Sequence, residues 1–145
     1  MELSVGIVAS RFNQPVVDEL LDACLSQLEK EGISKNNIDL ESVPGALEIP
    51  IILDLMALKK KYHVLIAIGA VIRGETYHFE VVSDQSAQGL LQVQLNHHIP
   101  IINGIITTND DDQAFARTKI KGAEAAKAAI EMAHLTKKLS GHVRK

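Results

Sequence analysis

Cysteine is nearly absent from this sequence: Cys24 is the single thiol in 145 residues. One cysteine cannot form an internal disulfide, and no cluster of cysteine and histidine residues has the spacing of a zinc site. Cys24 lies in an apolar pattern with helical spacing, which favours a small buried hydrophobic residue over a reactive thiol. We therefore expect neither a disulfide nor a bound metal.

The chain also lacks a basic excess, a long apolar run and many aromatic residues. It has 15 lysine and arginine residues against 18 acidic ones, and no basic cluster before its extreme C terminus, which argues against nucleic-acid binding. No apolar run is long enough to cross a membrane, and no signal peptide precedes the first apolar stretch. We expect a cytoplasmic protein with no membrane partner. Aromatic residues make up only 3% of the chain, so the place of each one is informative.

What is present is an ordinary globular composition with a regular order of elements. Hydrophobic residues make up 46% and charged residues 23% of the chain, which suits one domain over residues 1–145. Four stretches are predicted to be strands, at residues 3–9, 38–43, 63–72 and 100–107. Helical patterns follow them at about residues 16–31, 46–61, 83–97 and 110–138. This alternation predicts a three-layer α/β/α fold, in which a four-stranded parallel sheet has helices on both faces.

Several residues are typical of helix ends. Asn13, just before Pro15, is expected to cap the first helix, and Gly32 to end it. Lys59–Lys61 close the second helical pattern, where cations at the negative end of the helix dipole are a better explanation than a nucleic-acid patch. Asp110–Asp112 open the last helical pattern, at the positive end of its dipole.

The segments that follow the four predicted strands are SRFN, PGALE, RGETYHFE and TTND. Ligands of parallel sheets bind beyond the carboxyl ends of the strands, so these four segments are the places where a ligand is expected. Phe12 in SRFN either folds back over the core or offers a flat surface on which a ring stacks. Glu48 in PGALE either interacts with the helix dipole or accepts hydrogen bonds from ligand hydroxyls.

The segment RGETYHFE is the densest in polar groups. Gly74 allows a tight turn, after which the backbone N–H groups of Glu75 and Thr76 could seat an anion near a helix start. His78 can transfer a proton near neutral pH, although an isolated histidine is often only structural or exposed. Arg117, in the last helix, is either solvated, paired with the acidic first turn, or a phosphate ligand. Together these groups indicate carbonyl or amine chemistry on a phosphorylated substrate, with an aromatic ring bound alongside.

Four motifs follow one another along the chain: SRFN, VPGALEIP, AIGAVIRGETYHFE and PIINGIITTNDDDQAFAR. In this order and spacing, from Val5 to about Leu135, the sequence resembles the 6,7-dimethyl-8-ribityllumazine synthase family. The resemblance implies a flavodoxin-like fold and the penultimate step of riboflavin biosynthesis. In that step, 5-amino-6-(D-ribitylamino)uracil condenses with 3,4-dihydroxy-2-butanone 4-phosphate, and phosphate and water are released. The resemblance also implies no metal or organic cofactor, sites between neighbouring subunits of a pentamer, and riboflavin synthase as a partner.

Residue roles follow from the same resemblance. The residues implied to bind the pyrimidine ring and the ribityl chain are Phe12, Ala46, Leu47, Glu48, Ala70, Val71, Ile72 and Asn103. In this set, Phe12 stacks on the ring, Glu48 accepts from ribityl hydroxyls, and the backbone of Ala70–Ile72 holds the pyrimidine edge. The phosphate group is implied to bind Glu75 and Thr76, assisted by Arg117 of the adjacent subunit. His78 is the implied proton-transfer residue, and we expect Glu75 to face the anion with its backbone.

Three features depart from many members of the family. Asn103 stands where many members have phenylalanine, and we expect activity to be retained through its backbone or amide. Arg117 is followed by Lys121-Gly122 after about four fewer residues than usual, and the usual N-terminal arm is almost absent. Both of these departures argue against a 60-subunit shell. Two alternatives stay open: a catalytically weak relative that binds flavin or lumazine, and a scaffold that forms assemblies or shells.

Overall fold

The protein is built on a parallel β-sheet. Its structure is a computed structural model that describes residues 2–74 and 77–140. Within these residues the four strands are β1 (Val5–Ser10), β2 (Ile38–Val43), β3 (Val64–Ile72) and β4 (Ile101–Thr108). They lie in the order β2-β1-β3-β4, and each neighbouring pair runs parallel. The predicted parallel sheet is therefore confirmed.

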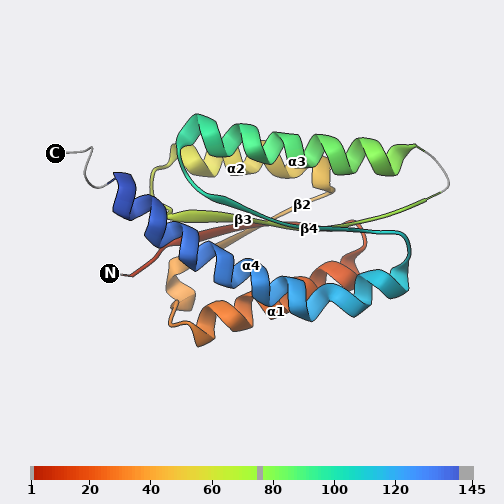
Figure 1. The fold of residues 1–145 in the computed structure, drawn as a ribbon, viewed down its shortest axis with the longest axis horizontal. Helices are drawn as coiled ribbons and strands as arrows, with labels where there is room; N and C mark the ends of the chain where they lie inside the picture. Colours follow the sequence, from red (N-terminus) through yellow and green to blue (C-terminus); the bar gives the residue numbers. More distant parts are fainter. Residues whose placement is uncertain (1, 75–76, 141–145) are drawn as a thin grey trace.

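Helices cover both faces of this sheet. The α-helices of the described residues are α1 (Gln14–Lys30), α2 (Ile49–Leu58), α3 (His78–His97) and α4 (Asp111–Ser140). Two short 3-10 turns, η1 (Lys35–Asn37) and η2 (Ala46–Glu48), flank β2. Figure 1 shows α1 and α4 packed together on one face, with α2 and α3 on the other. This is the three-layer, flavodoxin-like arrangement that the sequence predicts.

The central strand β3 forms the middle of the core. Every residue from Val64 to Val71 is buried, as expected of a parallel strand covered on both faces. Alternate side chains point to opposite layers: Ile66 and Ile68 pack with the cluster under α1 and α4, whereas Leu65 and Ala67 pack with the cluster under α2 and α3. The apolar run of β3 is thus required by burial, and the polar segment begins where the strand leaves the core.

Helices α1 and α4 approach each other closely because α4 presents small residues to α1. A Cβ atom on Gly122 would lie only 2.4 Å from the Leu20 carbonyl oxygen and 2.7 Å from the Ala23 Cβ. Nearby, the buried Thr118 hydroxyl donates to the Glu19 carboxylate at 2.9 Å. Helices α1 and α4 therefore pack closely against each other on one face of the sheet, and the Thr118–Glu19 hydrogen bond fixes how far one helix is shifted along the other.

Several predicted boundaries and caps are wrong. The helix predicted from residue 83 begins at His78, five residues earlier, so His78 lies in its first turn rather than in a loop. Residues 46–48 form a 3-10 turn instead of the start of α2, and α2 ends at Leu58. Lys61, expected at the helix end, instead forms an ion pair with Asp39 at 2.9 Å. Strands β1, β3 and β4 each start one or two residues later than predicted.

No helix of the described residues is long and apolar enough to cross a membrane. Cys24 is fully buried, and burial raises the pKa of its thiol to about 12. The interpretation of Cys24 as a buried hydrophobic residue is confirmed.

Candidate active site

A cavity of about 500 Å³ opens at the carboxyl ends of β1 and β3. It receives residues from the three segments that follow β1, β2 and β3. The residues implied for ligand binding or catalysis that line it are Phe12, Ala46, Leu47, Glu48, Ala70, Val71, Ile72 and His78. Three of the four strand-end segments therefore meet at the carboxyl edge of the sheet, whereas TTND does not line this cavity.

Phe12 is held by its backbone rather than by burial of its ring. Its N–H donates to the Pro44 carbonyl at 3.0 Å, and the Arg11 N–H donates to the Val43 carbonyl at 2.8 Å. These bonds fasten the segment after β1 to the segment after β2. The ring itself is 73% exposed, so the interpretation of Phe12 as a cover over the core is wrong. An exposed ring on a fixed backbone can stack on a flat ligand.

Asn13 performs a task that the sequence did not reveal. It occupies the N-cap position of α1 in the left-handed conformation, with φ 63°, but its side chain makes no cap bond. Its amide donates instead to the Ala70 carbonyl at 3.0 Å. Asparagine tolerates this backbone conformation better than most residues. Asn13 therefore ties the Phe12 segment to the end of β3.

The last residues of β3 offer backbone groups to the cavity because β1 is shorter. The pairing of β3 with β1 ends at Ile68, whereas its pairing with β4 continues to Ile72. In a parallel strand the N–H and C=O groups of alternate residues face the same neighbouring strand. Those of Ala70 and Ile72 therefore face the side of β3 on which β1 lies, beyond the point where the pairing with β1 ends. The Ala70 carbonyl on this edge is occupied by Asn13. Ile72 is thus the better placed of the two to hold a ligand edge.

Glu48 lies where η2 passes into α2. It is exposed, it occupies the N-cap position of α2, and its side chain makes no cap bond there. The carboxylate lies near Gly45, because a Cβ on that glycine would be 3.1 Å from the Glu48 Oε1 atom. A carboxylate at the positive end of a helix is stabilised by the dipole and can still accept hydrogen bonds from hydroxyl groups. Both interpretations of Glu48 fit this place.

His78 is the first residue of α3, and its exposed side chain lines the cavity beside Phe79. Gly74 lines the same cavity, and a Cβ there would meet no atom within 4 Å. The expected phosphate seat, Glu75 and Thr76, lies outside the described residues. What the structure does bring together is the histidine, the glycine and the end of β3.

Asn103 and Arg117 line a different cavity. This second cavity, of about 420 Å³, lies between β4 and α4 and does not include Phe12 or His78. No ion pair joins Arg117 to the acidic first turn of α4 among the described residues. The Asn103 side-chain oxygen accepts from the Ile105 N–H at 3.0 Å, which leaves its amide N–H groups for other contacts.

Two residues of this second cavity were not recognised from the sequence. Lys121 and Glu124 line it with Arg117, and their side chains form an ion pair at 3.4 Å. The signal that could have found them is their spacing: residues four and seven positions after Arg117 share one face of a helix. The β4–α4 edge therefore carries two cations and one carboxylate around a hollow.

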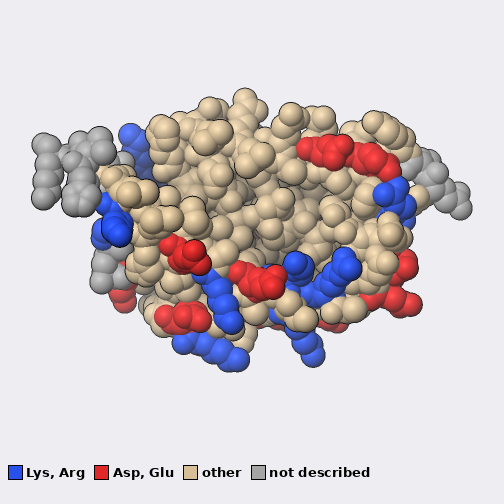
Figure 2. Space-filling model, in the orientation of Figure 1, with Lys and Arg blue, Asp and Glu red and all other residues tan. Residues whose placement is uncertain are grey.

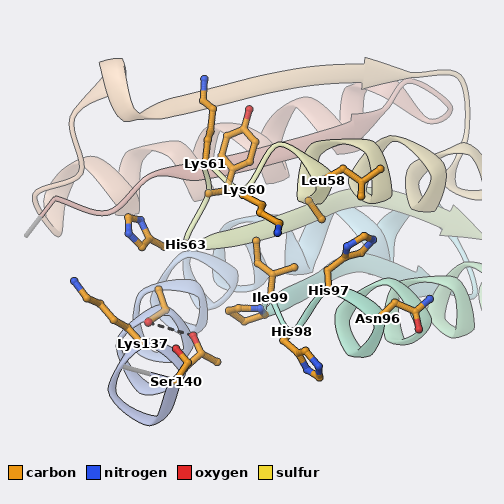
Figure 3. Close-up of a pocket in the computed structure, with 15 residues that line it drawn as sticks. Leu58, Lys60, Lys61, His63, Asn96, His97, His98, Ile99, Lys137 and Ser140 are labelled. Carbon is orange, nitrogen blue, oxygen red and sulfur yellow. Dashed lines mark hydrogen bonds between the residues drawn. The ribbon is translucent and has the colours of Figure 1, made fainter. Parts of the chain in front are cut away.

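A third cavity, of about 740 Å³, lies at the opposite, amino-terminal edge of β3 and β4. Figure 3 shows basic side chains around it, among them Lys60, Lys61 and His97. Lys60 follows the end of α2, where a cation meets the negative end of the helix, and His97 is the last residue of α3. Lys61 pairs with Asp39 at 2.9 Å, and His97 with Asp54 at 2.7 Å. These partners give Lys61 and His97 structural roles, so the cavity at the carboxyl edge is the better candidate for the active site.

The described residues hold no group of three or more histidine, cysteine, aspartate or glutamate side chains that could bind a metal ion.

Comparison with known proteins gives a consistent assignment. The family model described as 6,7-dimethyl-8-ribityllumazine synthase matches residues 2–137. A protein of that name from Nitrosospira multiformis is 59% identical over 138 residues, which cover 95% of this chain and 86% of the relative. Those from an Azoarcus species and from Methylobacillus flagellatus are each 55% identical. The Azoarcus match covers 94% of this chain and 88% of the relative. The Methylobacillus match covers 95% of this chain and 93% of the relative. The chain therefore belongs to the 6,7-dimethyl-8-ribityllumazine synthase family.

Proposed function

We propose that this chain condenses 5-amino-6-(D-ribitylamino)uracil with 3,4-dihydroxy-2-butanone 4-phosphate to form 6,7-dimethyl-8-ribityllumazine, in riboflavin biosynthesis. The observation that carries the proposal is one cavity at the strand ends that combines the exposed Phe12 ring, the Glu48 carboxylate and His78. Membership of the family supports the same reaction. The proposed location is the cytoplasm, and the proposed partner enzyme is riboflavin synthase, as the family resemblance implies.

The pyrimidine substrate would lie between Phe12 and the end of β3. Phe12 stacks on the ring, the backbone of Ile72 reads its polar edge, and Val71 lines the wall beside it. Glu48 accepts hydrogen bonds from the ribityl hydroxyls. An apolar wall with a few placed polar groups suits a flat heterocycle that carries a hydroxylated chain. This wall is completed next to Glu48 by Ala46 and Leu47.

The reaction needs two substrates close together and a place for developing charge. The free amine of the pyrimidine attacks the ketone and loses water to give an imine. Phosphate is then eliminated, and ring closure releases a second water. His78 moves protons between these steps, while holding both substrates in one cavity supplies much of the rate. The backbone of Glu75 and Thr76, with Arg117, stabilises the leaving phosphate.

Arg117 and Asn103 serve this chemistry if they come from a neighbouring copy of the chain. In one copy they line the β4–α4 cavity, apart from the cavity that holds His78. Figure 2 shows a broad band without charged side chains over β4 and the middle of α3, between acidic side chains near the start of α3 and the charged surface of α4. Large apolar side chains are also exposed on α2 and α3: Ile51, Leu55, Leu58, Leu91 and Leu95. Such a surface is typical of an interface between subunits. The proposed assembly is a pentamer with one site at each boundary.

The direct test mixes purified protein with both substrates and follows the absorbance and fluorescence of the lumazine product. We expect product formation that depends on both substrates. Absence of product at saturating concentrations would reject the proposed reaction. Tight binding of the pyrimidine substrate or of lumazine without turnover would favour a catalytically weak ligand-binding relative instead.

A further inference from the structure

Arg73 and Glu80 have no part in the reaction as proposed above, yet they are held at the edge of the site. Arg73 is the first residue after β3, and Glu80 lies in the first turn of α3. The Arg73 backbone N–H donates to the Thr108 carbonyl at 2.8 Å, which extends the pairing of β3 with β4 by one residue. Its side chain then turns toward the start of α3.

The guanidinium group of Arg73 makes three different contacts. Its Nε donates to the Asn109 side-chain oxygen at 3.0 Å, just beyond the end of β4. Its Nη1 forms a hydrogen-bonded ion pair with Glu80. Its central carbon lies 4.3 Å from the centre of the Phe79 ring, which is a stacking distance. One planar group therefore joins the end of β3, the end of β4 and the first turn of α3.

The arrangement requires arginine in particular. A guanidinium group offers donors at fixed positions in one plane and stacks through its face, so it can make these contacts at once. A lysine ammonium group is a point charge without this plane. The Arg73 side chain is 46% exposed, and exposed ion pairs contribute little to stability. We therefore expect the contacts of Arg73 to affect the position of the neighbouring elements more than the free energy of unfolding.

The two ends that Arg73 joins are the ends of one functional segment. Residues 74–77 connect β3 to α3 and include Glu75 and Thr76, the proposed phosphate seat. Phe79 lines the cavity directly beside His78. We propose that Arg73 is a positioning residue, which with Glu80, Asn109 and Phe79 clamps the end of β3 to the first turn of α3 and so sets the position of His78 relative to β3. The inference rests on the proposed function.

Two roles of Arg73 predict different effects of a change at Glu80: clamping the start of α3, or binding the phosphate group directly. If Arg73 holds the segment through Glu80, then loss of the Glu80 charge should impair the enzyme as loss of Arg73 does. If Arg73 itself binds phosphate, then Glu80→Gln should free the guanidinium group and leave phosphate affinity equal or improved. The Glu80 variant therefore separates the two roles.

The experiment measures steady-state kinetics of Arg73→Met, Arg73→Lys, Glu80→Gln and the double variant Arg73→Met/Glu80→Gln. We expect Arg73→Met and Glu80→Gln each to raise KM for the phosphorylated substrate and lower kcat, about tenfold in kcat/KM, since small misplacements of reacting groups are costly. Arg73→Lys should rescue little. The double variant should be no worse than Arg73→Met, because the pair acts as a unit. The Kd of the pyrimidine substrate should change by less than about twofold, since its proposed wall lies outside the clamp.

Lys61→Met is a matched control for these variants. Lys61 also forms an exposed ion pair, with Asp39, and lies 5.5 Å from the centre of an aromatic ring, Tyr62, but at the opposite edge of the sheet. Like Arg73→Met, it should change Tm little, and it should leave both KM values unchanged. If Arg73→Met does not fold, Glu80→Gln and Asn109→Ala report on the same clamp.

Two outcomes would overturn the clamp alone: kinetics of Arg73→Met equal to those of Lys61→Met, or normal phosphate dependence in Glu80→Gln. A wild-type protein that forms no product would overturn the clamp and the proposed function together.

Discussion

Phe12 shows how one residue can serve binding without serving stability. Its ring is 73% exposed, and its position comes from backbone hydrogen bonds that any side chain would keep. We predict that Phe12→Ala weakens binding of the pyrimidine substrate about tenfold, the order expected for loss of one aromatic stacking contact. The Tm should stay within the error of the wild-type value. Titration calorimetry and thermal unfolding measure the two effects.

Phe12→Trp is the matched variant, because it keeps a flat ring at the same place. It should bind the pyrimidine with nearly wild-type affinity. If Phe12→Ala binds normally, or if it loses stability in step with affinity, the stacking role is wrong.

His78 lies at the start of α3, where it lines the cavity but is not part of the core. We predict that His78→Gln lowers kcat by about a hundredfold, within the range measured for general acid–base groups. The Kd of the pyrimidine substrate should be unchanged, because the ring wall remains. Stopped-flow kinetics measure kcat, and binding titrations measure the Kd.

The control is His98→Asn, at an exposed left-handed position that asparagine tolerates. Equal activity of the two variants would contradict a role for His78.

At the scale of the elements, the contact between α1 and α4 determines how firmly the sheet is supported. Gly122→Ala would place a Cβ atom 2.4 Å from the Leu20 carbonyl oxygen, so the helices would have to separate. Better helix propensity offsets only part of this cost, and we predict a net loss of about 1–2 kcal/mol in the free energy of unfolding. Denaturant titration measures it. Lys127→Ala, on the exposed face of the same helix, should change stability by less than about 0.5 kcal/mol. Equal stability of the two variants would show that the helices adjust freely.

The elements also show what the sequence could and could not predict. The alternation of apolar runs with helical patterns was enough for the parallel sheet, and placing ligands at the carboxyl ends brought Phe12, Glu48 and His78 to one cavity. The start of α3 was missed because its first turn carries half-exposed and polar residues, which weaken helical periodicity. The bond from Asn13 to the Ala70 carbonyl joins residues 57 positions apart, and no local pattern encodes such a contact.

At the scale of the whole molecule, His63 makes stability depend on pH. Burial lowers the pKa of its imidazole, and the nearby Lys137 and His134 lower it further. Its Nδ1 atom accepts a hydrogen bond from the Ser4 N–H at 2.9 Å, which a neutral ring allows. The unfolded chain therefore binds a proton more readily than the folded one, so stability should fall as pH decreases below about 6.5. Urea unfolding at pH 7.5 and pH 5.5 measures the loss. His63→Asn should show a smaller loss, and an equal loss would exclude His63 as the cause.

The whole-molecule feature with the strongest consequence is the separation of the proposed site residues into two cavities, with His78 in one and Arg117 in the other. If neighbouring copies complete each site, His78→Ala and Arg117→Ala damage different sides of the same boundary. Each variant alone should be nearly inactive. Unfolding and refolding the two together in equal amounts should restore about a quarter of wild-type activity, because random neighbours in a closed ring pair two intact sides at that frequency. Native mass measurement should show the mixed rings.

The matched control mixes His78→Ala with Phe12→Ala, which lie in one cavity, so no boundary regains two intact sides. Activity in the first mixture no higher than the sum of its parents, despite mixed rings, would place the complete site within a single subunit.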